Sequence, residues 1–156
     1  MTVASHPSSP TRIDPAAAGV TEALIRAQVR AFYGKARRDP ALGPIFDRAV
    51  TDWDYHLTKM CDFWSSVLLM TGRFRGAPMA VHAALPTLRP AHFSRWLSLF
   101  EQTAHEVCPP DAAALFITRS RMIGQSLQRH IADARGEPAW MAGDIAGDGR
   151  VEGIPE

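Results

Sequence analysis

Three features of this sequence predict an all-α fold. Apolar residues recur at three- and four-residue steps in four long stretches, which is the period of a helix with one buried face. Proline and glycine gather between these stretches, where they end one helix and open the next. No stretch alternates apolar and polar residues for long enough to predict a strand. With 156 residues, 46% of them hydrophobic, the chain is expected to form one domain with a real core.

The first half of the chain predicts two long helices. The first covers residues 21–38, with Thr21 as its N-cap, and the pair Asp39-Pro40 ends it because a residue before proline disfavours the helical region. Residues 42–46 (Leu-Gly-Pro-Ile-Phe) predict a tight connection. The second helix is expected over residues 52–71, with Gly72 closing its end. The apolar faces of these helices carry Leu24, Ile25, Val29, Phe32 and Tyr33, then Trp53, His56, Met60, Phe63 or Trp64, and Val67.

The second half predicts three more helices. A short one over residues 78–85 begins at Pro78, which suits a first helical turn, and Pro86 forbids its continuation. Pro90 opens the next helix, and the last begins near residues 109–111 and continues to about residue 135. The apolar faces of these two longer helices carry Phe93, Trp96, Leu97 and Phe100, then Phe116, Ile123, Leu127 and Ile131.

The two ends of the chain differ from the middle. Residues 1–19 are rich in proline and small residues, and residues 136–156 are rich in glycine; neither shows a repeating apolar face. Both are predicted to be flexible tails around a folded domain of residues 20–135.

Composition excludes several classes of protein. The net charge is +1 and no basic stripe is present, so no nucleic-acid partner is expected. No apolar run approaches the roughly 18 residues of a membrane span, and the N-terminal region lacks the apolar centre of a secretory signal. We therefore expect a soluble, cytoplasmic protein. Cys61 and Cys108 lie in apolar helical patterns, which favours packing roles over a disulfide.

Two of the six histidines have apolar surroundings in the sequence. His82 lies in the short predicted helix among small apolar residues, and His56 lies on the apolar line between Trp53 and Met60. An imidazole in such a place either meets a hydrogen-bond partner in the core or binds a ligand. The remaining histidines are expected in the N-terminal tail or at the surface: His6, His92, His105 and His130.

The usual metal-site and enzyme motifs are absent from the sequence. No Cys or His pair has the close spacing of a structural zinc site, and there is neither a glycine-rich phosphate loop nor a Gly-x-Ser-x-Gly motif. What remains is an aromatic-rich helical core with two inward-facing histidines. A haem pocket requires this chemistry, namely a flat apolar slot, one imidazole for the iron and a few polar groups on the other side. A haem-free helical regulatory or interaction domain with two buried structural histidines is the alternative.

Between residues 23 and 131 the sequence resembles the truncated haemoglobins, and among them the third group. The paired-glycine motifs of the other truncated groups are absent, which agrees with this resemblance. The matching fragments are, in order, Ala31-Phe32-Tyr33, Leu42-Gly43-Pro44-Ile45-Phe46, Trp53-x-x-His56, Phe63-Trp64, Pro78-x-x-x-His82, Phe93-x-x-Trp96-Leu97-x-Leu99-Phe100 and Arg121-Met122-Ile123.

The resemblance implies a two-over-two sandwich of helices that encloses haem b, with His82 as the proximal ligand of the iron. The second ring nitrogen of His82 is then expected to donate to the carbonyl of Pro78, four residues back. No Asp or Glu occurs among residues 77–85 to draw the imidazole toward an anion, which favours ligand binding over peroxidase-like chemistry. The same resemblance implies apolar and aromatic haem contacts from Phe46, Met60 and Phe63.

The distal side implied by the resemblance contains Tyr33, His56 and Trp96. Tyr33 is expected to be the main hydrogen-bond donor to bound dioxygen, with Trp96 in support. For His56, three roles remain open: it gates the pocket, accepts a proton during peroxide chemistry, or binds the iron as a sixth ligand. Cations for the haem propionates are predicted at three arginines that flank the proximal helix: Arg73, Arg75 and Arg89.

Two classes of haem function fit these residues. The first is reversible binding of dioxygen or another diatomic ligand, for transport, storage or scavenging. The second is a redox enzyme that acts as a nitric oxide dioxygenase, a nitrite reductase or a peroxidase. Because the chain has no flavin or nicotinamide motif of its own, turnover would require a separate reductase. The sequence favours ligand binding.

Overall fold

The computed structural model describes residues 13–78, 82, 85 and 87–136. Five helices have defined bounds in this part of the chain: α1 (Glu22–Ala36), α2 (Gly43–Ala49), α3 (Trp53–Leu69), α5 (Pro90–Val107) and α6 (Pro110–Ala134). None of the described residues lies in a strand, so the prediction of an all-α fold is confirmed. Most of the two predicted tails, residues 1–12 and 137–156, lies outside the described residues.

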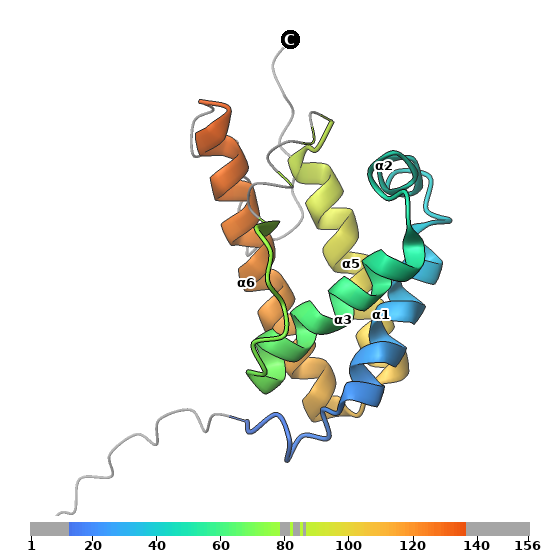
Figure 1. The fold of residues 1–156 in the computed structure, drawn as a ribbon, viewed down its shortest axis with the longest axis vertical. Coiled ribbons are helices and arrows are strands. Elements are labelled where there is room, and N and C mark those ends of the chain that lie inside the picture. The colour runs from blue at the N-terminus through green and yellow to red at the C-terminus, as the bar shows by residue number, and fades with distance from the viewer. Residues whose placement is uncertain (1–12, 79–81, 83–84, 86, 137–156) are drawn as a thin grey trace, which may run out of the picture.

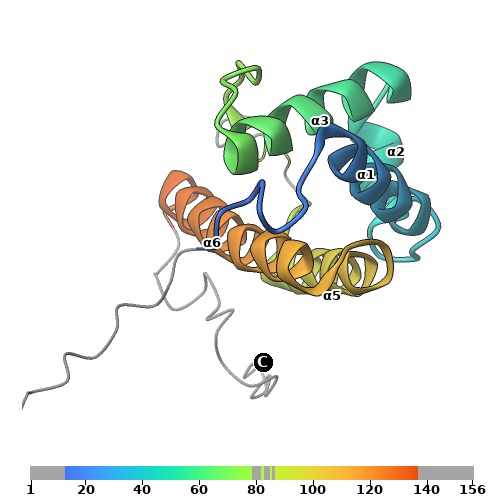
Figure 2. The same ribbon diagram turned by 90° about the horizontal axis from the view of Figure 1, so that it is seen from below.

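The helices are arranged in two layers (Figures 1 and 2). α1 packs on α3 in one layer and α5 packs on α6 in the other, and α1 also contacts α5 across the layers. α5 and α6 are joined through Cys108 and Pro109 alone, and so short a connection makes the two helices antiparallel neighbours. This arrangement is the two-over-two sandwich that the family resemblance implied.

α1 begins and ends close to where the sequence placed it. The side chain of Thr21 accepts a hydrogen bond from the backbone N–H of Leu24 at 3.1 Å, which caps the helix as predicted. The residues of α1 that face the core follow the helical period: Ile25, Gln28, Val29, Phe32, Tyr33 and Ala36.

The predicted tight connection at residues 42–46 is wrong, because Gly43 opens the two-turn helix α2. Oδ2 of Asp39 accepts hydrogen bonds from the backbone N–H groups of Ala41 and Leu42, both at 3.0 Å, and so stabilises the turn that leads into α2. Gly43 lies so close to α1 that a Cβ on it would be 2.6 Å from the carbonyl oxygen of Arg37. A helix of seven residues is too short to show a periodic apolar face in the sequence.

α3 and the segment after it lead toward His82. Asp52 caps α3 by accepting a hydrogen bond from the N–H of Tyr55 at 3.1 Å. The helix ends at Leu69, because Met70 takes the left-handed conformation with φ 55°, so the predicted end at residue 71 is two residues too late. Within the short helix predicted at residues 78–85, Pro78 and His82 are helical, and residues 79–81, 83 and 84 lie outside the described ones.

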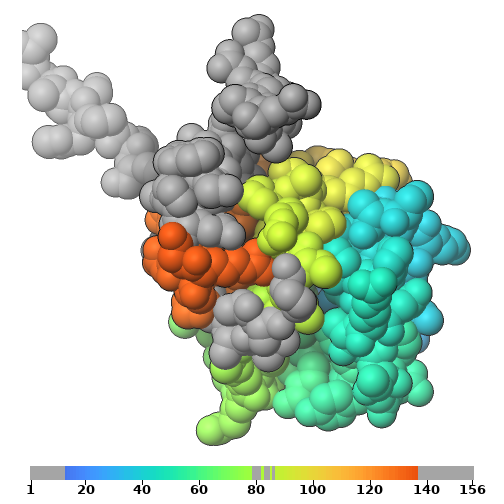
Figure 3. Space-filling view, turned by 90° about the horizontal axis from the view of Figure 1, so that it is seen from above, coloured from blue at the N-terminus to red at the C-terminus, as the bar shows by residue number. Residues whose placement is uncertain are grey.

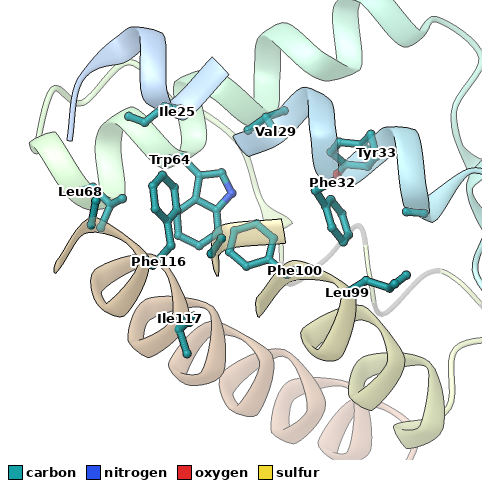
Figure 4. Packing of buried hydrophobic residues seen from close by; sticks show 14 of the residues in the cluster. Ile25, Val29, Phe32, Tyr33, Trp64, Leu68, Leu99, Phe100, Phe116 and Ile117 are labelled. Carbon is teal, nitrogen blue, oxygen red and sulfur yellow. The ribbon is translucent and has the colours of Figure 1, made fainter. Parts of the chain in front are cut away.

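The core between the layers contains a cluster of aromatic rings (Figure 4). Trp64 of α3 stacks on Phe100 of α5, with ring centroids 5.0 Å apart. Trp96 stacks on the same phenylalanine at 5.1 Å, and Phe116 of α6 packs against both Trp64 and Phe100. This aromatic cluster joins the two layers, and three of its rings line the cavity described below: Trp64, Trp96 and Phe100.

Cys61 and Cys108 are half-buried free thiols, which is compatible with the packing roles predicted for them. Each helix that the structure describes is too short or too polar to span a membrane.

Candidate functional site

A cavity of about 440 Å³ lies between the two helical layers. This volume is within the range of about 300–1,000 Å³ that is usual for ligand pockets. Most of the lining is apolar, as in pockets for small organic ligands and cofactors. The polar side chains that line it include Tyr33, His56, His82 and Trp96, so the structure brings together at one cavity the four residues on which the sequence prediction rested.

Tyr33 and His56 are joined by a hydrogen bond at the wall formed by α1 and α3. The phenol oxygen of Tyr33 lies 3.0 Å from Nε2 of His56. The ring of Tyr33 is held edge-on by Phe46 and Trp53, with centroids at 5.4 and 5.7 Å. Because aromatic rings enclose the phenol, it has a fixed position at the cavity.

Burial determines the charge of both members of this pair. Desolvation raises the pKa of the Tyr33 phenol far above its ordinary value, and the negative charge of the Cys61 thiolate adds to this effect. Desolvation also lowers the pKa of His56, and the positive charge of His82 lowers it further. At neutral pH the cavity therefore presents a protonated phenol and a neutral imidazole.

His82 is oriented by its own backbone. Its Nδ1 lies 2.6 Å from the carbonyl oxygen of Pro78, which can only accept, so Nδ1 carries the proton. In the neutral ring, Nε2 then has a lone pair that is available to a ligand. The contact to Pro78 is the one predicted from the sequence, and His82 is half-buried at the cavity.

Trp96 reaches the cavity from α5. Its ring is stacked on Phe100 at an interplanar angle of 10° and meets Phe32 edge-on at 5.6 Å. Two such contacts restrict the indole to one orientation. The side chain lines the cavity, and its indole N–H is a hydrogen-bond donor only.

The three predicted apolar contacts, Phe46, Met60 and Phe63, all line the cavity. Phe63 meets Phe74 edge-on at 5.2 Å, which connects α3 with the segment that leads to His82. Phe93, Ile123 and Leu127, which the sequence placed on apolar helical faces, also line the cavity. The sequence prediction missed other parts of the apolar wall, which include Ile45, Phe74, Leu85 and Leu88. Several of these residues lie in short or irregular segments, where no period shows which side chains face inward.

The three predicted arginines occupy different places. Arg75 lines the cavity. Arg73 does not line it and forms an ion pair of 3.0 Å with Glu22 of α1. Arg89 is also absent from the lining, and its guanidinium lies 3.4 Å from the carbonyl of Leu88.

Two further basic side chains line the cavity that the sequence analysis did not assign to it: Lys59 and His92. Lys59 follows His56 by three residues on α3, so the helical period could have identified it. His92 was expected at the surface. Its Nδ1 accepts a hydrogen bond of 2.9 Å from the N–H of Arg89, which leaves the proton of a neutral ring on Nε2. With Arg75, these residues add positive charge or N–H donors to an otherwise apolar cavity.

The donor set does not form a site for a bare metal ion. In the part of the chain that the structure describes, no three His, Cys, Asp or Glu side chains are grouped in a way that could hold one. One oriented imidazole in an apolar cavity instead fits a metal that is already held by an organic ring.

Comparison with known proteins agrees with this geometry. No protein-family model matches the sequence. Over 101 residues the chain is 35% identical to the group 3 truncated hemoglobin ctb of Campylobacter jejuni, and the match covers 62% of this chain and 80% of that protein. A crystal structure of a group III truncated hemoglobin from Campylobacter jejuni aligns with a TM-score of 0.69 and 32% identity, and the alignment covers 72% of this chain and 91% of the other. The predicted resemblance is thereby confirmed, and the chain belongs to the group III truncated haemoglobins.

Proposed function

We propose that this chain holds haem b through His82 and binds dioxygen and other small diatomic molecules in the cavity. The observation that carries the proposal is the hydrogen bond between Nδ1 of His82 and the carbonyl of Pro78, because it leaves Nε2 free inside an apolar pocket. Membership of the truncated haemoglobins supports the same function.

The residues present fit a haem in three respects. The lining is mainly aromatic and aliphatic, which suits the faces of a flat macrocycle. His82 supplies one neutral imidazole, the usual protein ligand of haem iron in globins. Arg75, Lys59 and His92 supply cations or N–H donors for the two haem carboxylates.

When bound, haem supplies an iron atom that takes a diatomic ligand and can change its oxidation state. The part of His82 is to hold that iron with a ring of fixed tautomer. Its Nδ1 partner is a neutral carbonyl, and none of the hydrogen bonds among the described residues joins His82 to an Asp or Glu. A carbonyl draws less charge onto the imidazole than a carboxylate does, and this favours ligand binding over cleavage of an O–O bond.

Tyr33, His56 and Trp96 supply the polar side of the pocket. The indole N–H of Trp96 can only donate. In the hydrogen bond between the Tyr33 oxygen and Nε2 of His56, either the phenol or the imidazole is the donor. When His56 is protonated on Nε2 and donates to the phenol oxygen, the Tyr33 hydroxyl is free to donate to a polar molecule in the cavity. We propose that this arrangement, together with Trp96, retains a ligand that carries partial negative charge.

Absorption spectroscopy tests the proposal. Hemin is titrated into the hemin-free protein, and spectra are recorded in the ferric, dithionite-reduced and carbon monoxide forms. The wild type should give a stoichiometric Soret band that shifts with carbon monoxide, and His82→Ala should weaken the band or change its character. His130→Ala, which alters an exposed histidine of α6, should match the wild type. A folded wild type that takes up no hemin would refute haem binding and leave the haem-free alternative.

A further inference from the structure

The chain segment that follows His82 is held against α6. Leu88 is buried in an apolar cluster with Leu127 and Ile131 of α6, and Leu85 packs on the same cluster. Figure 3 shows this segment, in yellow-green, lying beside the C-terminal end of α6, in orange. Apolar contacts of this kind have no preferred direction, so they do not by themselves fix the position of the backbone.

The shortest directional contacts come from Arg135, at the C-cap of α6, and they add to two longer bonds of 3.4 Å, from the Arg89 guanidinium to the Leu88 carbonyl and from the Leu88 N–H to the Leu85 carbonyl. The two terminal nitrogens of Arg135 donate to two different backbone carbonyls, one to that of Leu88 and the other to that of Leu85, both at 2.7 Å. The backbone N–H of Arg135 is bonded to the carbonyl of Ile131 at 3.1 Å, so the guanidinium extends from an ordered helix end. The planar guanidinium can hold two acceptors at a fixed separation, which an ammonium group cannot.

The hydrogen bonds continue from this guanidinium to His82. The N–H of Leu85, whose carbonyl Arg135 holds, donates to the carbonyl of His82 at 3.1 Å. The ring of His82 in turn donates to Pro78 at 2.6 Å. Arg135 is therefore connected to the backbone of His82 through a single residue, although the two are far apart in the sequence.

We propose that Arg135 is a positioning residue for His82: by holding the carbonyls of Leu85 and Leu88, it fixes the backbone from which the imidazole enters the cavity. No pattern in the sequence indicated this role, because residue 135 is the last of the predicted domain and lies at its edge. The proposal rests on the function of His82 proposed above, but the hydrogen bonds themselves can be tested without haem.

The test compares the full chain with Arg135→Gln, Arg135→Lys and Arg129→Gln. Arg135→Gln removes both the charge and the pair of guanidinium nitrogens that hold the two carbonyls. Arg135→Lys keeps the charge but lacks this pair of donors. Arg129 is an exposed arginine of the same helix, and its variant serves as the control. Two measurements use the haem form: the rate of hemin loss to an excess of an apoglobin acceptor, and the iron–histidine stretching band of the ferrous protein in resonance Raman spectra. A third uses the hemin-free protein, in which NMR follows hydrogen exchange of the Leu85 and Leu88 amides.

Arg135→Gln is expected to lose hemin roughly tenfold faster, which corresponds to about 1.4 kcal/mol. Its iron–histidine band should shift or broaden, and the amide of Leu85 should exchange faster. Arg135→Lys should fall between Gln and the wild type, and Arg129→Gln should match the wild type. If Arg135→Gln does not fold, as judged by circular dichroism, Arg135→Lys decides the question with the same measurements.

The proposal is wrong if the Arg135 variants match the wild type in the rate of hemin loss, in the Raman band and in amide exchange. Faster hemin loss with an unchanged band and unchanged exchange would also overturn it, since the arginine would then act on haem affinity without positioning His82. If the wild type itself takes up no hemin, the proposed function fails, and exchange of the Leu85 amide alone decides whether Arg135 holds this segment.

Discussion

The phenol oxygen of Tyr33 lies 3.0 Å from Nε2 of His56, and the two groups act as one unit because a single hydrogen lies between them. Burial keeps the phenol protonated and the imidazole neutral at neutral pH. The tautomer of His56 therefore decides whether Tyr33 donates to the histidine or toward the cavity. A ligand that accepts a hydrogen bond from Tyr33 selects the tautomer in which His56 is protonated on Nε2.

Replacing Tyr33 with Phe should accelerate the release of dioxygen. One hydrogen bond contributes a net of about 0.5–1.5 kcal/mol, so the dissociation rate should rise roughly two- to tenfold. Stopped-flow mixing of the oxygenated protein with carbon monoxide measures this rate. Ser98→Ala removes an exposed hydroxyl of α5 that does not line the cavity, and it should leave the rate unchanged. An unaltered rate in Tyr33→Phe would show that Tyr33 is only an aromatic core residue.

The lowered pKa of His56 predicts how the stability of the hemin-free protein depends on pH. In the unfolded chain a histidine titrates near 6.5, but folded His56 takes up its proton only at lower pH. As the pH falls through about 6.5, the unfolded state therefore binds more protons than the folded state, and the free energy of unfolding decreases.

Urea unfolding at about pH 7.5 and about pH 5.5 measures this loss of stability. His56→Gln should lose less stability over the interval than the wild type, because the substituted side chain binds no proton. The exposed His130 provides the control, since His130→Gln should keep the wild-type pH dependence. Equal pH dependence in all three proteins would contradict the assignment to His56.

The long helices were predicted well from the sequence and the short segments poorly, for a physical reason. α1, α5 and α6 bury a repeating face over four or more turns, so their period is visible without knowledge of their partners. α2 depends on Asp39 and on a close approach of Gly43 to α1, both of which are tertiary features.

The same distinction applies to the site. Tyr33, His56 and Trp96 lie on periodic helical faces and were predicted to face inward, and all three line the cavity. Arg73 does not line the cavity and instead pairs with Glu22, a residue far away in the sequence. The position of His92 at the cavity depends on the direction in which α5 leaves the segment before it, and no local sequence pattern predicts that direction.

Asp39 should contribute more to stability than the other acidic residues in ion pairs. Its side chain is 3% exposed, and Oδ1 receives a hydrogen bond of 2.7 Å from Arg95 of α5, while Oδ2 accepts from two backbone N–H groups. Burial by itself would raise the pKa of Asp39, but these hydrogen bonds and the charge of Arg95 lower it, so the carboxylate stays ionised. Asp39→Ala should destabilise the protein by roughly 1–3 kcal/mol, since it leaves the buried N–H of Leu42 without a partner and removes the acceptor of Ala41 and Arg95.

Denaturant unfolding of three variants tests this expectation. Asp39→Asn keeps an oxygen acceptor and should be less destabilising than Asp39→Ala. Glu106→Gln alters an exposed carboxylate that pairs with Lys35 and should change stability little, because exposed ion pairs contribute little. Equal stability of Asp39→Ala and the wild type would contradict a structural role for the carboxylate at the start of α2.

Substitution by alanine at two glycines should change the stability of the protein in opposite directions. A Cβ on Gly43 would lie 2.6 Å from the carbonyl oxygen of Arg37, and backbone cannot move aside as a flexible side chain can. Gly43→Ala should therefore separate α2 from the end of α1 and cost roughly 1–3 kcal/mol.

Gly34 lies on the exposed face of α1, where an added Cβ would meet no other atom within 4 Å. Gly34→Ala should therefore stabilise the protein by about 0.5–1 kcal/mol through helix propensity. Thermal and urea unfolding of the two variants measure the signs directly, and a stabilising Gly43→Ala would mean that α2 does not approach α1 this closely.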